Sequence, residues 1–381
     1  MKKLFCPGSC ICWPLIVYAL LIYSPKSPAA EAPAGKLPKF HIIASGQAVK
    51  IDSLVRQVIN RTIAQKYGEA LVLADSVARL APEEPAGYFF RAAVLQARML
   101  DYGGLEDEKT FFNATGTCRK LAQKKLRQNI KDAWAHFFLG SALGYEAFFL
   151  GKKKRYFEAF RTGWQCIQHL EAALKHDPQL YDAYLGIGTY KYYRSKMSKN
   201  FTWLPFVDDE RAEGIRMVRQ AIANGRYSRS AAINGLSWIL MDENRSKEAL
   251  VLVDSALTLY PGSRFFLWAA AAAAYRVERY DQAAVCYGQI LQSLQNENAL
   301  SPYIELVCRT RLARAYQAVN KKEPACEELQ RIDALELSKD DRSRGEAFLK
   351  EVALYRKECE GRLTGARHQD SPNGPKARTN H

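Results

Sequence analysis

The amino-acid sequence predicts an all-α, right-handed solenoid of about seven helical hairpins, three of them elongated, ending in a C-terminal capping helix. Two observations predict this fold. Three similar stretches begin at Ala86, Trp134 and Asp182, 48 residues apart each time. Downstream the interval contracts to 34 residues, between Ala249 and Ala283. Self-similarity at such periods is typical of stacked helical repeats.

The shorter form of the repeat is also present upstream. The stretch "YGEALVLADSVARLAP" at 67–82 has the same form as "SKEALVLVDSALTLYP" at 246–261. Within the 48-residue form, an aromatic residue or His is followed four positions later by a small residue. Those pairs are Tyr88 and Ala92, His136 and Gly140, and Tyr184 and Gly188. Small residues recur farther along at the same interval, at Cys118, Cys166 and Gly214.

A 34-residue helix-turn-helix unit with a small residue in each helix resembles the tetratricopeptide repeat (TPR). The resemblance covers about 310 residues and implies seven units and a cap. These are 51–82, 85–130, 133–178, 181–226, 230–261, 264–295 and 305–337, with the cap at 341–363. No unit matches the TPR pattern in full, because His136 and Ile233 occupy aromatic positions and the closing Pro is missing after the second, fourth, sixth and seventh units. The resemblance implies a binding surface rather than a catalytic centre.

The apolar run "WAHFFLGSALGYEAFFLGKKKRY" at 134–156 has three possible interpretations. A membrane span is disfavoured because Glu146 and His136 lie within it. A phosphate-binding loop would need Gly-Lys-Ser/Thr after a strand. We therefore expect the run to form the first helix of the third unit.

The second, third and fourth units each hold 14 residues more than the basic unit. Fourteen residues make about four helical turns, so each helix of a hairpin gains two turns and the hairpin protrudes by roughly 10 Å. Gly103, Gly151 and Lys199-Asn200 are expected at the three tips. The tips are acidic and aromatic, basic, and aromatic respectively. Their aromatic residues either pack between hairpins or contact a partner or membrane.

The middle region also resembles, weakly, the tetratricopeptide repeat protein 39 group and its bacterial look-alikes. The matching residues are Gly188, Tyr190, Tyr192, Tyr193, Leu204, Pro205, Asp209, Arg211, Gly214 and Ile215. This resemblance implies membrane association at most, and no activity.

The first helices of the units are expected to line a concave groove rich in aromatic side chains, which are typical binding anchors. The candidate partner-binding residues are Phe89, Trp134, Phe137, Phe138, Tyr145, Tyr192, Tyr193, Trp238, Trp268 and Tyr275. They predict a groove for a protein or peptide. Two alternatives stay open: a tightly wound solenoid would turn them into core, and an enclosed cavity would carry a lipid or other apolar ligand.

A second candidate surface is basic. Its residues are Arg119, Lys120, Lys124, Lys125, Lys152, Lys153, Lys154 and Arg155. They form either a solvated outer face or a patch that docks the solenoid on an anionic membrane surface. The net charge of +15 favours anionic partners in general.

The N-terminus predicts export. Lys2 and Lys3 precede the apolar stretch Ile11–Tyr23 and a small-residue segment, so residues 1–30 are expected to be a signal peptide. An uncleaved anchor is the alternative. Residues 31–50 are expected to be a linker, and the polar segment 364–381 a disordered tail. An exported, periplasmic or envelope protein meets little nucleic acid, so anionic envelope surfaces or acidic proteins are the expected partners.

The sequence contains no motif for catalysis, a cofactor or a metal. His169 and His176 lie two turns apart on one expected helix, a loose spacing for a metal. Cys118 and Cys166 occupy small-residue positions and are expected in the core. Cys326 and Cys359 lie on neighbouring antiparallel helices, so those two thiols could meet, and an oxidising compartment would permit their bond.

Overall fold

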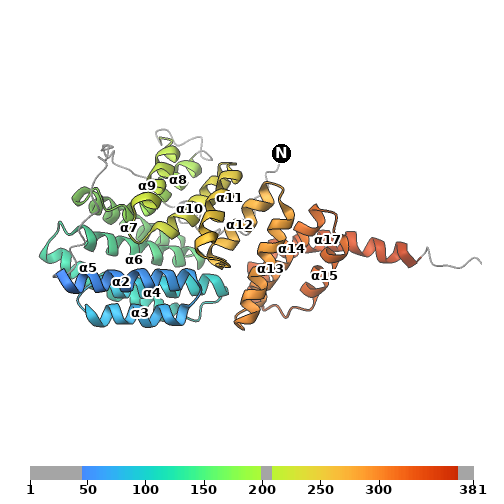
Figure 1. Ribbon diagram of the computed structural model, residues 1–381, viewed down its shortest axis with the longest axis horizontal. Helices are drawn as coiled ribbons and strands as arrows, with labels where there is room; N and C mark the ends of the chain where they lie inside the picture. Colours follow the sequence, from blue (N-terminus) through green and yellow to red (C-terminus); the bar gives the residue numbers. More distant parts are fainter. Residues whose placement is uncertain (1–44, 199–207, 368–381) are drawn as a thin grey trace, which may run out of the picture. The chain divides into compact units, whose positions relative to one another are not determined.

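The computed structural model describes residues 45–198 and 208–367. The chain divides into two compact units, with the boundary between Val277 and Glu278. Every regular element among the described residues is a helix (Figure 1), which confirms the all-α prediction. The predicted signal peptide, most of the linker, the third hairpin tip and the end of the tail lie outside the described residues.

The first unit contains five complete helical hairpins and one further helix. They are α2 (Ser45–Ile63) with α3 (Tyr67–Leu80), α4 (Pro85–Tyr102) with α5 (Glu108–Gln128), α6 (Ala133–Lys152) with α7 (Tyr156–His176), α8 (Asp182–Ser198) with α9 (Arg211–Asn224), α10 (Arg229–Asp242) with α11 (Ser246–Leu259), and α12 (Arg264–Arg276). Helix α2, the first within the described residues, begins at Ser45, inside the segment 31–50 that was expected to be a linker. The unit boundary falls inside the predicted repeat 264–295, where a single continuous solenoid was expected.

Short turns connect the two helices within most hairpins. Gln65, Lys154 and Asn244 each adopt a positive φ of about 60° in such a turn, and Gly103 does so at 75°. A left-handed residue reverses the chain directly after a helix, so the following helix packs antiparallel to the preceding one. Gly103 lies at its turn as predicted, whereas Gly151, the residue predicted for the second tip, lies in the last turn of α6, and the chain reverses at Lys154.

The recurring small residues are explained by close contacts between paired helices. A Cβ atom added to Gly140 of α6 would lie 2.9 Å from the carbonyl oxygen of Cys166 in α7. One added to Gly188 of α8 would lie 2.6 Å from the carbonyl oxygen of Gly214 in α9. The small residues that recur every 48 positions therefore lie where the first and second helices of a hairpin contact each other. Gly140 and Gly188 belong to the first helices, and Cys166 and Gly214 to the second helices.

The apolar run of the third unit forms α6, which is 20 residues long and largely buried. Asp132 caps its N-terminus by accepting a hydrogen bond from the backbone N–H of Ala135, at 2.9 Å. Neither α6 nor any other described helix is long and apolar enough to cross a membrane. The run is thus the first helix of a hairpin, as expected.

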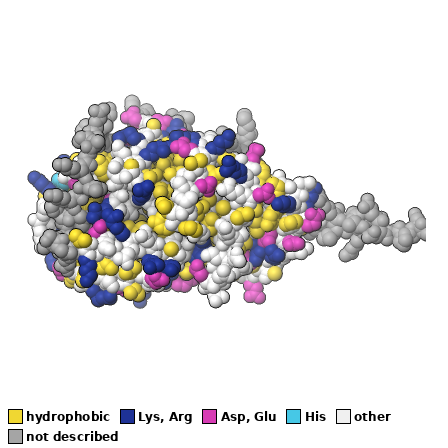
Figure 2. Space-filling model, in the orientation of Figure 1, with side chains coloured by type: hydrophobic (Ala, Val, Ile, Leu, Met, Phe, Trp, Pro, Cys, Tyr) yellow, Lys and Arg dark blue, Asp and Glu magenta, His cyan; other side chains and the backbone are white. Residues whose placement is uncertain are grey.

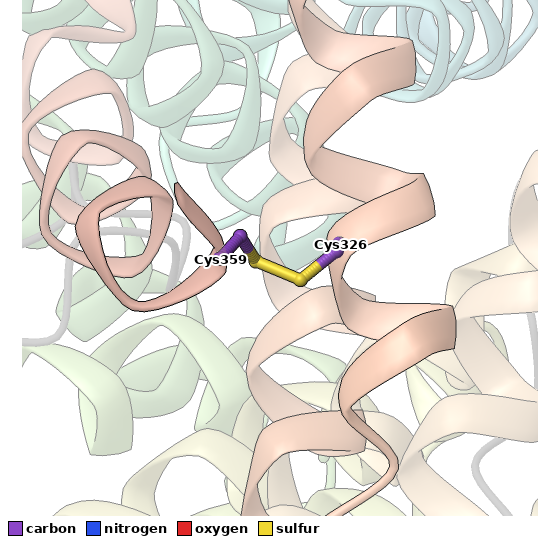
Figure 3. The surroundings of a disulfide bond; sticks show 2 residues. All are labelled: Cys326 and Cys359. Carbon is purple, nitrogen blue, oxygen red and sulfur yellow. A yellow bond between two sulfur atoms is a disulfide. The ribbon is translucent and has the colours of Figure 1, made fainter. Parts of the chain in front are cut away.

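The described part of the second unit consists of five helices. They are α13 (Tyr280–Asn296), α14 (Pro302–Ala318), α15 (Lys322–Asp333), α16 (Lys339–Arg344) and α17 (Glu346–Arg367). Cys326 of α15 and Cys359 of α17 form a disulfide, with their Cα atoms 5.9 Å apart (Figure 3). The bond that the sequence left open therefore ties the capping helix to the last repeat. Cys118 and Cys166 in the first unit are buried thiols, as expected.

Candidate partner-binding surfaces

The first unit closes on itself through α2. The Asp52 carboxylate accepts hydrogen bonds from Arg226 Nε at 2.8 Å and from the Tyr227 hydroxyl at 2.7 Å. Burial raises the pKa of Asp52, but these hydrogen bonds and the charge of Arg226 outweigh it, and the net pKa is lowered. A second carboxylate fixes the same loop, since Asp182 accepts from the backbone N–H groups of Arg226, Tyr227 and Ser228 at 2.8–3.1 Å. We call this set the Asp52 closure.

A second closure joins the other end of α2 to α12. The Arg264 guanidinium, whose side chain is 0% exposed, donates to the Asp101 carboxylate at 2.6 Å. The Tyr67 hydroxyl donates to the same carboxylate at 2.9 Å. The Ser263 hydroxyl donates to the carbonyl oxygen of Ile63, at 2.7 Å. We call this set the Arg264 closure. Residues roughly 160–200 positions apart in the sequence are thus in direct contact.

These closures fill the predicted aromatic groove with the chain itself. Phe89 packs against Phe137 and Phe138, with ring centroids 6.3 and 5.6 Å apart. Tyr227, held by Asp52, packs against the Trp134 ring at 6.0 Å and against Phe90 at 5.4 Å. Aromatic side chains dominate core energetics when they pack on each other in this way.

Half of the predicted groove residues are therefore core residues, and their assignment to an open binding surface is wrong. They are Phe89, Trp134, Phe137, Phe138 and Tyr192, each at most 8% exposed. Tyr192 is also held at its polar end, because its hydroxyl donates to Glu243 at 2.9 Å. The physical reason is the tight closure of the first unit, one of the alternatives that the sequence left open.

The other five predicted residues are partly exposed. They are Tyr145, Tyr193, Trp238, Trp268 and Tyr275. They lie on α6, α8, α10 and α12, and each of these helices contacts the next. A smaller row of aromatic residues thus remains accessible on the first unit.

The predicted basic patch is largely neutralised by ion pairs. Arg119 pairs with Glu146 at 2.7 Å, Lys124 with Glu83, and Lys125 with Glu84. On the face shown in Figure 2, Lys and Arg side chains are scattered, and several lie beside acidic ones. The interpretation of these three residues as free docking cations is wrong, because each pairs with a glutamate, two of them in the loop between α3 and α4 and one on α6.

The remaining patch residues, Lys152–Arg155, lie at the tip of the α6–α7 hairpin, and Lys120 is exposed on α5. Lys153 pairs with Glu108 at the start of α5, and Arg155 pairs with Glu158. The pair between Lys153 and Glu108 places the tip beside the N-terminus of α5. Both acidic partners are themselves exposed or partly exposed, so the cations stay at the surface.

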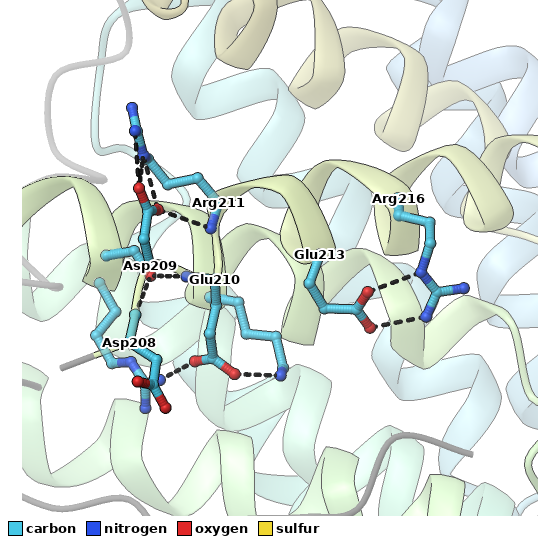
Figure 4. Close-up of polar contacts among 9 residues, drawn as sticks. Asp208, Asp209, Glu210, Arg211, Glu213 and Arg216 are labelled. Atoms are coloured by element: carbon cyan, nitrogen blue, oxygen red, sulfur yellow. Dashed lines mark hydrogen bonds and ion pairs between the residues drawn. The ribbon is translucent and has the colours of Figure 1, made fainter. Parts of the chain in front are cut away.

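The residues that resemble the tetratricopeptide repeat protein 39 group have a structural role where they are described. Arg211 reaches back to Asp209 at 2.9 Å (Figure 4). It also pairs with Glu243, at 2.9 Å. Glu210 pairs with Lys191 at 2.6 Å and with Arg194, so it ties the start of α9 to α8. These contacts hold the α8–α9 hairpin together. Leu204 and Pro205 lie outside the described residues.

Three histidines cluster at the base of the α6–α7 hairpin, where the sequence indicated two. Nδ1 of His136 lies 3.0 Å from Nδ1 of His169, and the His176 ring stacks on His136 with centroids 5.8 Å apart. His136 Nε2 faces the carbonyl oxygen of Ile130 at 3.0 Å. Within the described ranges, no group of three or more His, Cys, Asp or Glu residues is arranged to hold a metal ion.

Sequence-based comparisons give no relative. No model of a protein family matches the chain, and no curated protein matches it significantly. The resemblance to the tetratricopeptide repeat protein 39 group therefore stays a prediction.

Solved structures give the fold. The chain is similar to a chain of the APC/C hetero-tetramer Cut9-Hcn1, with a TM-score of 0.50 and 14% identity over 82% of its length. It spans 49% of that chain. It is also similar to the C-terminal part of a TPR repeat-containing protein from Cytophaga hutchinsonii, with a TM-score of 0.39, 16% identity and coverage of 76% of this chain and 98% of that one. Human IFIT1, solved as a dimer with m7Gppp-AAAA, aligns with a TM-score of 0.42 and 13% identity over 84% and 82% of the two chains.

The Cut9-Hcn1 alignment agrees with the hairpin arrangement and the repeat spacing. Together they define the class: an all-α, TPR-like helical-repeat protein.

Proposed function

We propose that this protein is an exported, non-catalytic helical-repeat scaffold that binds a protein or peptide partner. The observation that carries the proposal is the row of partly exposed aromatic residues on α6, α8, α10 and α12. Aromatic side chains combine a large contact area with few rotatable bonds, so they dominate binding energy in many interfaces. A row across four helices, each in contact with the next, fits an extended or helical peptide.

The second unit supports export. The disulfide between Cys326 and Cys359 would persist in an oxidising compartment and would be reduced in the cytosol. The signal peptide expected at residues 1–30 and the net charge of +15 agree with an envelope location. There the basic α6–α7 tip would dock the scaffold on an anionic surface, and nucleic acid would not be a partner.

The alternative function, a carrier of a lipid or other apolar ligand, has weaker support. Two of the residues expected to line its cavity, Phe137 and Phe138, pack against Phe89 and Trp134. The Asp52 and Arg264 closures bring α2 against the loops of later hairpins. An interior packed by its own aromatic side chains leaves little reason for a ligand to enter.

Site-specific photo-cross-linking in the producing cell tests the proposal. A photoreactive amino acid would replace Trp238 or Trp268 in one set of variants. In the matched control it would replace Val72 on α3, which is 63% exposed. We expect one protein partner to be cross-linked from both aromatic positions and not from position 72.

The partner would then be purified and its affinity measured. Changing Trp268 to Ala should weaken binding about tenfold to thirtyfold, as for an aromatic anchor at an interface. Equal cross-linking from all three positions would contradict the proposal. Recovery of a stoichiometric lipid without any cross-linked protein would instead favour the carrier.

A further inference from the structure

The tip of the α6–α7 hairpin has an unusual surface. We call residues Lys152–Phe157 the aromatic-basic tip. The side chain of Phe157 is 77% exposed, the highest value among the large hydrophobic residues that stand exposed in the described part of the chain, and Tyr156 is 43% exposed. Four cationic residues, Lys152 to Arg155, directly precede them, without an acidic residue between. An apolar ring in water beside such a charge cluster needs a physical explanation.

The fold holds Phe157 outward. Helix α7 begins at Tyr156 and buries the face formed by Ala159, Gly163, Cys166 and Leu170. Successive helical residues are about 100° apart, so Phe157, two positions before Ala159, lies on the opposite side of the helix. Phe157 is therefore exposed because of its position on α7, opposite the buried face of the helix.

The backbone turn at the tip is also fixed. Lys154 adopts a φ of 60°, and the backbone N–H groups of Lys154 and Arg155 donate to the carbonyl oxygens of Gly151 and Leu150 at 3.0 and 2.9 Å. The ion pair between Lys153 and Glu108 ties the turn to the start of α5. The tip therefore presents its cations and aromatic rings together in one defined arrangement.

The neighbouring hairpin adds apolar surface. Leu105, in the α4–α5 turn three residues before Glu108, is 43% exposed. Lys109 on α5 is exposed as well. The α4–α5 turn thus adds the apolar side chain of Leu105, which Glu106 follows in the sequence, and the pair between Glu108 and Lys153 brings this turn next to the aromatic-basic tip.

We propose that the aromatic-basic tip binds an anionic phospholipid bilayer. Phe157 inserts at the boundary between headgroups and acyl chains, and Lys152, Lys154 and Arg155 lie at the level of the lipid phosphates. This inference rests on the docking role in the proposed function and names its ligand. Basic residues beside exposed aromatic rings are the combination that interfacial membrane binding requires.

Charge and shape favour a bilayer over an acidic peptide. Electrostatic attraction alone explains the cations, but it gives no reason for an exposed Phe157. A peptide-binding site buries its aromatic anchors in a groove between elements, whereas Phe157 lies at the outer end of a hairpin. A bilayer accepts a protruding ring because the lipid deforms around it.

Sedimentation with lipid vesicles tests the proposal. The chain recovered after export would be mixed with vesicles of phosphatidylcholine alone or with about one third phosphatidylglycerol, at low and at physiological salt. We expect binding only to the anionic vesicles, weakened by salt because the attraction is screened. Lys154→Gln should weaken binding about fivefold, and Phe157→Ala about tenfold.

Two matched controls use equally exposed residues elsewhere in the first unit. Leu259, 69% exposed on α11, and the exposed Lys247 on the same helix lie outside the tip. Leu259→Ala and Lys247→Gln should leave vesicle binding unchanged. A Phe157→Trp variant gives a second readout, because its added fluorescence should be quenched by lipids brominated on the acyl chain.

Equal binding to neutral and anionic vesicles would overturn the proposal, as would equal losses in the tip and control variants. So would a soluble acidic polypeptide that binds as tightly as vesicles regardless of Phe157. Photo-cross-linking from position 268, repeated in the Phe157→Ala background, separates the two hypotheses. If the cross-link forms but the parent protein does not bind vesicles, membrane docking alone is overturned. If the parent protein binds vesicles but no cross-link forms, partner binding alone is overturned.

Discussion

The two units of the protein are closed in different ways. The first unit closes non-covalently, through ion pairs and hydrogen bonds between α2 and residues that follow it by about 175–200 positions. The second unit closes covalently, with a disulfide between residues only 33 positions apart. Long-range contacts order a long segment of chain and depend on many weak interactions. A disulfide acts mainly by restricting the unfolded chain, so it suits a short segment with a small core.

Breaking the Arg264 closure should give the largest effect. Arg264 is fully buried, and its guanidinium forms an ion pair with the Asp101 carboxylate at 2.6 Å. Arg264→Met would leave the Asp101 carboxylate buried without its counter-charge, at a cost of about 3–5 kcal/mol in the unfolding free energy. Hydrogen exchange read by mass spectrometry in increasing urea should show the loss in α2 and α12 and little change in α14.

Two further variants test whether the loss of stability comes from the uncompensated buried charge. Arg264→Met combined with Asp101→Asn removes the uncompensated charge and keeps an acceptor for the Tyr67 hydroxyl, so it should be more stable than the single variant. Arg219→Met breaks an exposed pair with Glu248 in the same unit and should cost less than about 1 kcal/mol. Equal losses in the buried and exposed variants would show that closure does not depend on the buried pair.

Removing the disulfide should have the next largest effect, this time in the second unit. Cys326→Ala with Cys359→Ala opens a loop of 33 positions, which corresponds to a loss of about 3–4 kcal/mol. Exchange in α15 and α17 should accelerate, whereas α2 and α12 should be unaffected. A reductant should reproduce the change in the parent protein and do nothing to the double variant. A parent protein indifferent to the reductant would contradict the prediction.

The close contact between α8 and α9 should respond to a single methyl group. Gly188→Ala places a Cβ atom 2.6 Å from the carbonyl oxygen of Gly214 and 2.9 Å from the Cβ of Met217, so the helices must separate, at a cost of about 1–3 kcal/mol. Gly116→Ala in α5 meets nothing within 4 Å and should stabilise the protein by about 0.5–1 kcal/mol. Thermal unfolding of the two variants gives the comparison, and a shift in the same direction for both would refute the contact.

Much of the fold could be predicted from the sequence because it depends on local spacing. The recurrence of Gly140 and Gly188, and of Cys166 and Gly214, reports a contact between helices adjacent in the chain. Helices adjacent in the chain are also adjacent in space in a repeat protein. The pairing of Cys326 with Cys359 follows from the same argument, since their helices are near neighbours in the sequence.

The candidate site was predicted only in part because closure is not local. Nothing in the repeat pattern marks Asp52, Tyr227 or Arg264 as partners of distant residues, so the sequence could not decide whether Phe138 and Trp134 are buried or line a groove. Ion pairing of Lys124 and Lys125 depends on Glu83 and Glu84, about 40 positions away. The exposed Phe157 is different, because a ring beside four cations at a hairpin tip is visible in the sequence itself.

The histidine cluster of the first unit should produce the smallest effect, a loss of stability in mild acid. His136 Nε2–H donates to the Ile130 carbonyl, so its Nδ1 accepts the proton that His169 Nδ1 donates. Burial lowers the pKa of both rings, that of His169 to about 4.

In the unfolded state His169 has a pKa near 6.5. The unfolded state therefore binds more protons than the folded state as the pH falls from about 6.5 to 4. The stability that the neutral ring contributes is lost over that pH range. Because His169 is partly exposed, solvent screening limits the loss to about 1–2 kcal/mol. Unfolding free energies at pH 7.5, 6 and 5 should therefore fall more steeply in the parent than in a His169→Asn variant, and parallel profiles would show that the shared proton does not matter.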